Sequence, residues 1–110
     1  MPSFKRELMP GTVDVLVLRT LAFGPMHGYA ISQLVRSRTD GAIAIQSAAL
    51  YQALHRLERD KLVRGWWGLS DTNRRSKFYE ITAAGRKKLR AQSSELRTYV
   101  AALFAVLDAE

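Results

Sequence analysis

The sequence predicts a mainly α-helical fold with one small β-hairpin. Apolar residues recur at helical spacing in three stretches within the first 60 residues. After Leu62 the pattern changes to short runs of aromatic and branched residues separated by turn formers. A further helical pattern then continues to about Leu107. With 110 residues, 47% of them hydrophobic, the chain is long enough for one compact domain and too short for two.

The first two helices are delimited by capping and breaking residues. Thr12 is a plausible N-cap for a first helix, and Gly24-Pro25 stops it. Apolar side chains lie on almost every side of this helix, so it needs cover on more than one side, from its own domain or from a second subunit. The second helix is expected over about His27–Arg38 and ends at Asp40-Gly41.

The third helix carries the strongest functional signal. A brief strand is expected over residues 42–45, and Ser47 then caps a helix that ends near Asp60. One face of this helix collects Leu50, Ala53, Leu54 and Leu57. The opposite face carries hydrogen-bonding, aromatic and cationic groups and no acid, which suits a helix that reads the major groove of DNA. An ordinary solvated helix face is the alternative.

The second half of the chain predicts a hairpin and a long helix. Residues 62–67 and 76–81 are expected to form two strands joined by a somewhat long tip, with their aromatic residues packed in the sheet and core. Thr82 caps the last helix, which continues to about Leu107. Its apolar residues form a narrow seam that consists of Leu89, Leu96, Val100, Leu103 and Leu107.

Charge and composition narrow the classes of function. Lys and Arg number 17 against 10 Asp and Glu, which gives a net charge of +7 and favours a polyanionic partner over solubility alone. Without cysteine a metal site could use only His27, His55 and carboxylates, so we expect neither metal nor cofactor. No phosphate-binding loop, nucleophile elbow or His pair at ligand spacing is present, so we do not expect an enzyme. Neither a signal-peptide core nor a run of 18 apolar residues occurs, which predicts a cytoplasmic protein.

Three helices followed by a basic hairpin are the element order of a winged helix-turn-helix domain, in which the hairpin is the wing. Several segments carry a resemblance to a known family: Gly24-Pro25-Met26-His27-Gly28-Tyr29, Leu50-Tyr51, Ala53–Glu58, Trp67–Ser70, Asn73–Tyr79, Ile81-Thr82 and Gly85-Arg86. On these residues the chain resembles the PadR-like transcriptional regulators over nearly its whole length. The resemblance implies a dimeric, nucleoid-associated bacterial repressor of the subgroup with a short C-terminal part. Its winged helix-turn-helix DNA-binding domain would span residues 1–81, and a dimerisation helix in the same compact unit would span residues 82–110.

The chain departs from the family pattern after the third helix and in the segment Ala48-Ala49-Leu50-Tyr51-Gln52, where the family typically has Gly-Ser/Thr-Leu-Tyr-Pro. Where the family typically has glycine after the third helix, this chain has Lys61. A left-handed backbone conformation at this lysine would cost roughly 1 kcal/mol of stability. Where the family typically has proline, this chain has Gln52, whose amide can pair bidentately with adenine.

These observations give two sets of candidate residues. The DNA-binding set is Ser47, Ala48, Tyr51, Gln52, His55, Arg56, Arg59, Arg74, Arg75 and Lys77. The dimerisation set is Leu16, Leu96, Val100, Leu103, Phe104 and Leu107. His27 is expected to make a structural hydrogen bond at a helix start. Two alternatives stay open: a non-specific nucleic-acid-coating protein, and a regulator that senses a small molecule near the dimer interface, where Tyr99 and Phe104 could line a pocket.

Overall fold

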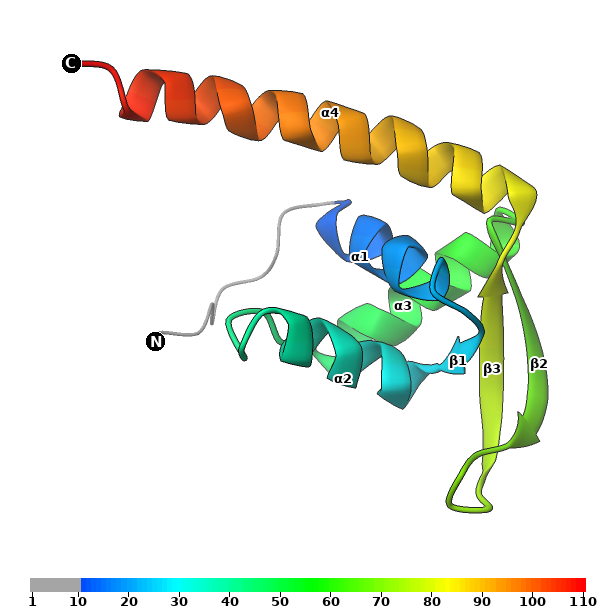
Figure 1. Cartoon of the computed structure of the whole chain (residues 1–110). Coiled ribbons are helices and arrows are strands. Elements are labelled where there is room, and N and C mark those ends of the chain that lie inside the picture. The colour runs from blue at the N-terminus through cyan, green and yellow to red at the C-terminus, as the bar shows by residue number, and fades with distance from the viewer. Residues whose placement is uncertain (1–10) are drawn as a thin grey trace.

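The computed structural model describes residues 11–110 as four helices and a small sheet (Figure 1). The first ten residues of the expected DNA-binding domain lie outside the described residues. The elements, in chain order, are α1 (Thr12–Leu21), β1 (Met26–His27), α2 (Gly28–Arg38), α3 (Ser47–Arg59), β2 (Val63–Leu69), β3 (Arg75–Ile81) and α4 (Ala83–Leu107). The three helices, the hairpin and the long last helix expected from the sequence are therefore confirmed.

Helix α1 lies at the centre of the core. It packs against α2, α3, α4 and β3, so several elements of its own chain provide the cover that its apolar surface requires. Val17 and Leu18 are fully buried, and they meet Ile31 of α2 and Leu54 of α3 in one continuous cluster. The buried hydroxyl of Thr20 donates to the carbonyl of Leu16 at 2.7 Å, so its burial leaves no polar group unpaired.

Two of the three predicted helix caps are wrong. The backbone carbonyls of Gly11 and Gln46 already accept the first hydrogen bonds of α1 and α3. Thr12 and Ser47 are consequently the first helical residues, and neither helix has a side-chain cap at the residue before it. A side chain at the first helical position is one residue too late for the capping geometry.

The other two predictions at helix starts are confirmed. The Nδ1 atom of His27 accepts a hydrogen bond from the amide of Ala30 at 3.2 Å, which is the expected structural role of this histidine. The hydroxyl of Thr82 accepts from the amide of Gly85 at 3.0 Å and caps α4.

The strand expected over residues 42–45 does not form. This segment is a loop, and its backbone is held by Thr39, whose hydroxyl accepts a hydrogen bond from the amide of Ile43 at 3.0 Å. Ile45 is buried in the core. The apolar composition of the segment therefore reflects packing beneath a loop, and no neighbouring strand is needed.

The turn after α3 keeps the left-handed conformation that glycine would favour. Lys61 has φ 61°. Its amide bonds to the carbonyl of Glu58 at 3.0 Å, and the amide of Leu62 bonds to the carbonyl of Leu57 at 2.8 Å. These two bonds form the Schellman arrangement that ends many helices. The chain thus accepts a strained lysine, at a cost of roughly 1 kcal/mol, to turn directly from α3 into β2.

The sheet contains three antiparallel strands in the order β1-β3-β2. The two-residue strand β1 was not expected from the sequence. The hairpin tip is shorter than predicted, because the strands continue to Leu69 and Arg75 and the amide of Ser70 bonds to the carbonyl of Arg74 at 2.8 Å. Asn73 has φ 62° in the turn, a conformation that asparagine tolerates better than most residues.

Helix α4 begins in very close contact with the turn that follows α3. A Cβ atom on Gly85 would lie 2.1 Å from the carbonyl oxygen of Leu62, so the glycine that weakens the helix is required by this approach. Leu89 is buried against the core. The helix then runs above α1 and continues past it, away from the rest of the described chain (Figure 1).

Candidate nucleic-acid interface

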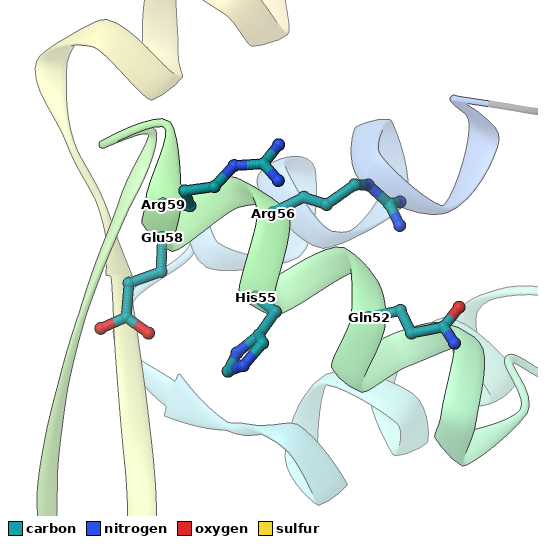
Figure 2. Close-up of a pocket in the computed structure, with 5 residues that line it drawn as sticks. All are labelled: Gln52, His55, Arg56, Glu58 and Arg59. Carbon is teal, nitrogen blue, oxygen red and sulfur yellow. The ribbon is translucent and has the colours of Figure 1, made fainter.

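Helix α3 has the two faces that its sequence predicts. Leu50, Ala53, Leu54 and Leu57 are all buried. The opposite face is exposed, and Figure 2 shows the residues that line an open hollow of about 650 Å³ along it: Gln52, His55, Arg56, Glu58 and Arg59. Hydrogen-bonding and cationic side chains thus project together from one stable helix, which is the geometry needed to reach base edges and phosphates.

Arg56, at one border of this face, is bound to α1. Its guanidinium lies 2.8 Å from the carboxylate of Asp14, although 42 positions separate the two residues in the sequence. Arg56 was predicted to contact DNA, and the structure gives it an intramolecular partner that no local pattern indicated. Among residues 11–110, Arg59 pairs only with its exposed neighbour Asp60, at 3.2 Å.

Glu58, at the other border, is bound to the wing. The ammonium of Lys77 lies 2.8 Å from its carboxylate, and in Figure 2 Glu58 points toward the hairpin strands. The hydrogen bond to Glu58 raises the pKa of Lys77 above its ordinary value. Beneath this pair the hydroxyl of Tyr79 also has a raised pKa, chiefly because burial disfavours its charged form.

The wing presents its cations at and near the tip. Arg74 and Arg75 are exposed, and within residues 11–110 neither guanidinium forms an ion pair. Arg75 stacks on the ring of Trp67, at 5.2 Å from its centroid. Trp67 was expected to pack in the sheet or core, but it lies on the exposed part of the wing, 58% accessible.

The opposite face of the hairpin is stabilised by aromatic contacts. Trp66 stacks with Phe78 at a centroid distance of 6.1 Å, and Phe78 meets the ring of His27 edge-on at 5.4 Å. Arg64 forms an ion pair with Glu80 on the same face. These residues have the sheet-packing role that the sequence predicted for Trp66 and Phe78.

A cleft of about 1120 Å³ separates the wing from the start of α2. Its walls include Tyr29, Tyr51 and Trp67, together with the basic residues Arg74, Arg75 and Lys77. Tyr51 fits against Gly28 so closely that a Cβ atom there would lie 2.8 Å from the tyrosine hydroxyl. The candidate set omitted Tyr29, which is 67% exposed; a helical wheel of α2 places it opposite the buried Ile31 and would have indicated its exposure.

Helix α4 exposes a long apolar surface beyond its contact with α1. Seven large apolar side chains between residues 96 and 107 are more than a third accessible: Leu96, Tyr99, Val100, Leu103, Phe104, Val106 and Leu107. Leu16, the α1 member of the predicted dimerisation set, is partly buried against the core.

A recess of about 250 Å³ between α1 and α4 is lined by Val15, Gln92, Leu96 and Tyr99, among others. Phe104, the second predicted pocket residue, is not part of it. Ligand pockets usually have volumes of about 300–1,000 Å³, so this recess is small for an effector site.

The described residues hold neither a cluster of metal-ligating side chains nor a helix suited to a membrane. Residues 11–110 contain no group of three or more histidine, aspartate or glutamate side chains that could hold a metal ion. Among their helices, none combines the length and apolar character that crossing a membrane requires.

Comparison with known proteins assigns the chain to a family. Residues 17–91 match the model of the transcriptional regulator PadR-like family. An uncharacterized protein of Lysinibacillus sphaericus is 33% identical over 86 residues, which cover 77% of this chain and 78% of that protein. The chain belongs to the PadR-like family of transcriptional regulators.

Solved structures of similar regulators share this fold. A transcriptional regulator from Clostridium thermocellum is 30% identical, with a TM-score of 0.78 over 86% of this chain and 92% of that one. A PadR family regulator from Clostridium difficile is 26% identical, with a TM-score of 0.76 over 88% of this chain and 99% of that one. The protein is thus a PadR-like transcriptional regulator with a winged-helix fold and a long C-terminal helix.

Proposed function

We propose that the protein is a homodimeric, sequence-specific DNA-binding repressor that occupies a pseudo-palindromic operator. The observation that carries this proposal is the exposed face of α3 with Gln52 and His55, together with the exposed wing residues Arg74 and Arg75, which form no ion pair within residues 11–110. A net charge of +7 supports the attraction of such a surface to DNA. Repression follows when bound protein excludes other proteins from the promoter.

The DNA-binding set divides by the chemistry of its members. Gln52 and His55 are assigned to base edges, because amide and imidazole groups discriminate donors from acceptors in the major groove. Tyr51, Arg59, Arg74 and Arg75 are assigned to phosphates, which position the protein without reading sequence. The remaining members of the proposed interface are Ser47, Ala48, Arg56 and Lys77.

The proposed dimer pairs the exposed apolar surface of α4 with that of a second copy. Seven exposed apolar side chains on one helix are more than a stable monomer ordinarily leaves in water. The proposed contacts are Leu16, Leu96, Val100, Leu103, Phe104 and Leu107, so residues 82–110 form the dimerisation helix of the unit. A two-fold axis through this interface would set the two α3 helices roughly 34–36 Å apart, or at a multiple of that distance.

Selection of bound fragments from random DNA tests the central proposal. A regulator of this kind enriches one motif with two inverted half-sites whose spacing matches whole turns of DNA. Enrichment of no motif, with binding to every fragment, would identify a non-specific coating protein instead.

The dimer has a separate test. Leu103→Asp with Leu107→Asp places charges in the apolar seam and should give monomers that bind a single half-site weakly. Thr98→Asp with Ala105→Asp is the matched control, because both residues are exposed on the opposite side of α4. Light scattering that found the unmodified protein monomeric at micromolar concentration would refute the dimer.

A further inference from the structure

We propose that Lys77 is a positioning residue for the wing. In this role it binds Glu58 of α3 and fixes the hairpin relative to the DNA-reading helix, and it does not itself supply a phosphate contact. The inference rests on the proposed function, since it concerns how two parts of one interface reach DNA together. It reassigns a residue that its charge and position in the wing had placed among the direct DNA contacts.

The geometry of the pair is unlike that of an exposed surface ion pair. The side chains of Lys77 and Glu58 are 27% and 32% accessible, and in residues 11–110 this is the one ion pair in which both partners are less than a third exposed. The two residues belong to different elements, 19 positions apart. The Lys77 ammonium also lies 5.5 Å from the ring centroid of Tyr79, which is buried in the core. These contacts hold the lysine against the protein.

The sheet provides space for the pair at Gly65. A Cβ atom at this position would lie 2.7 Å from Cε of Lys77 and 3.0 Å from Oε2 of Glu58. It would also lie 3.3 Å from the Tyr79 ring. Any larger residue would displace the ion pair. The absence of a side chain at Gly65 therefore leaves the space between α3 and the hairpin in which Lys77 and Glu58 meet.

The ion pair between Lys77 and Glu58 also affects the position of Arg75 near the tip of the wing. Lys77 lies opposite Trp67 in the register of β2 and β3, and Trp67 in turn supports the guanidinium of Arg75. Fixing Lys77 to α3 therefore fixes the strand that carries the exposed arginine. Because Glu58 already neutralises Lys77, little of its charge is left to attract a phosphate.

Replacement of Glu58 separates this role from a direct phosphate contact. Glu58→Met frees Lys77 and removes an acid from a surface that faces DNA. If Lys77 binds phosphate, this change strengthens binding; if Lys77 positions the wing, binding weakens by about 3- to 10-fold. Glu80→Met is the matched control, because it removes an acid of another wing ion pair on the opposite face of the hairpin. Tighter binding by Glu58→Met than by this control would overturn the proposal.

The salt dependence of binding gives a second readout. Lys77→Met should weaken binding by the same factor as Glu58→Met and should leave the slope of log K against log salt unchanged. Removal of a phosphate contact would instead reduce the magnitude of that slope by about 0.9 for each subunit. The double variant should bind like either single variant, because the two changes break one interaction. A reduced slope for Lys77→Met, or additive effects in the double variant, would count against positioning.

Two further variants guard against a general loss of folding. Exchange of the partners, Glu58→Lys with Lys77→Glu, should restore binding toward the parent value, whereas damage to the fold would not be repaired. Gly65→Ala keeps both charges but forces the ends of these two flexible side chains to shift, so it should weaken binding by less than Lys77→Met, with an unchanged salt slope. If the exchanged pair does not restore binding and Gly65→Ala does not weaken it, the proposal is refuted.

A measurement without DNA distinguishes this proposal from the proposed function. Residual dipolar couplings of backbone amides report the angle between the hairpin and α3 in solution. Glu58→Met and Lys77→Met should change that angle, and the exchanged pair should restore it. If the couplings respond while the parent binds no DNA, the proposed function fails and positioning stands. If the parent binds DNA and the couplings do not respond, positioning fails alone.

Discussion

Replacement of Gly85 by alanine tests the junction between α4 and the winged domain. Within a helix this change ordinarily stabilises by about 1 kcal/mol, because alanine has the higher helix propensity. Here the added Cβ would lie 2.1 Å from the carbonyl oxygen of Leu62, far closer than ordinary van der Waals contact. The obstacle is backbone, so the helix itself has to move.

The expected magnitude combines three effects. Overpacking of a tight site costs about 1–3 kcal/mol. The same Leu62 carbonyl accepts a hydrogen bond from the amide of Thr82 at 3.1 Å, and its displacement removes about a further 1 kcal/mol. The gain in helix propensity offsets about 1 kcal/mol. We expect Gly85→Ala to lower the free energy of unfolding by about 1–3 kcal/mol, which corresponds to a fall in Tm of roughly 5–15 °C.

Thermal and urea unfolding, followed by circular dichroism at one fixed protein concentration, measure this change. A fixed concentration is needed because association of subunits shifts apparent stability. Ala84→Gly is the control, since Ala84 is an exposed neighbour in the same turn and its replacement should cost only about 0.5–1 kcal/mol. A Gly85→Ala protein that melts above the parent would refute the close contact.

Three further predictions concern DNA binding and pH. Gln52→Ala should weaken specific binding by about 1–3 kcal/mol and relax the preference at one position of each half-site, because an amide pairs bidentately with adenine; an unchanged preference in a competition assay removes Gln52 from the base-reading residues. Arg74→Ala with Arg75→Ala should weaken binding to all sequences and reduce the salt slope by about 0.9 for each phosphate that each subunit no longer binds. A slope equal to the parent's would show that these arginines are only solvated. The raised pKa values of Lys77 and Tyr79 mean that the folded state holds both protons more tightly. This stabilisation is complete below the unfolded pKa values and is lost as pH rises through the folded ones, so the free energy of unfolding should fall above about pH 10. Lys77→Met should reduce the fall, and unfolding that is equally costly at about pH 9 and 11 would contradict the assignment.

The sequence was most informative about features that depend on a single helix or turn. The 3.6-residue period of α3 was sufficient to predict which four side chains are buried, because a helix between two capping turns has only one way to place an apolar stripe against a core. The same holds for the strained Lys61, since the turn after α3 is defined by local hydrogen bonds. The helices predicted from a periodic pattern over ten or more residues were confirmed.

Features that depend on the approach of two distant elements were not predictable. Arg56 projects from α3 as expected, but its partner Asp14 is 42 positions away and no spacing connects them. Strand β1 has two residues, too few to show a period, and it exists because the hairpin offers it an edge. The run that contains Trp66 and Trp67 lacks alternation, so only the register with β3 decides which ring faces solvent. The exposure of the α3 face was therefore predictable from the sequence, and the ion pairs at its borders were not.

The narrowness of the α3 face limits how much sequence information one subunit can read. Arg56 and Glu58, at the two borders of this face, form ion pairs with α1 and the wing. This leaves Gln52, His55 and Arg59 without an ion pair to another described element. Of these, Gln52 and His55 are assigned to base edges, and two side chains that each specify one base pair supply about 4 bits, so a matching site occurs by chance about once in 16 positions. Two subunits double this to about 8 bits, or once in about 256 positions, against the roughly 10⁶ or more competing sites in a genome. In the proposed complex the remaining discrimination has to come from the shape and stiffness of the DNA between and beside the half-sites, where the wings lie.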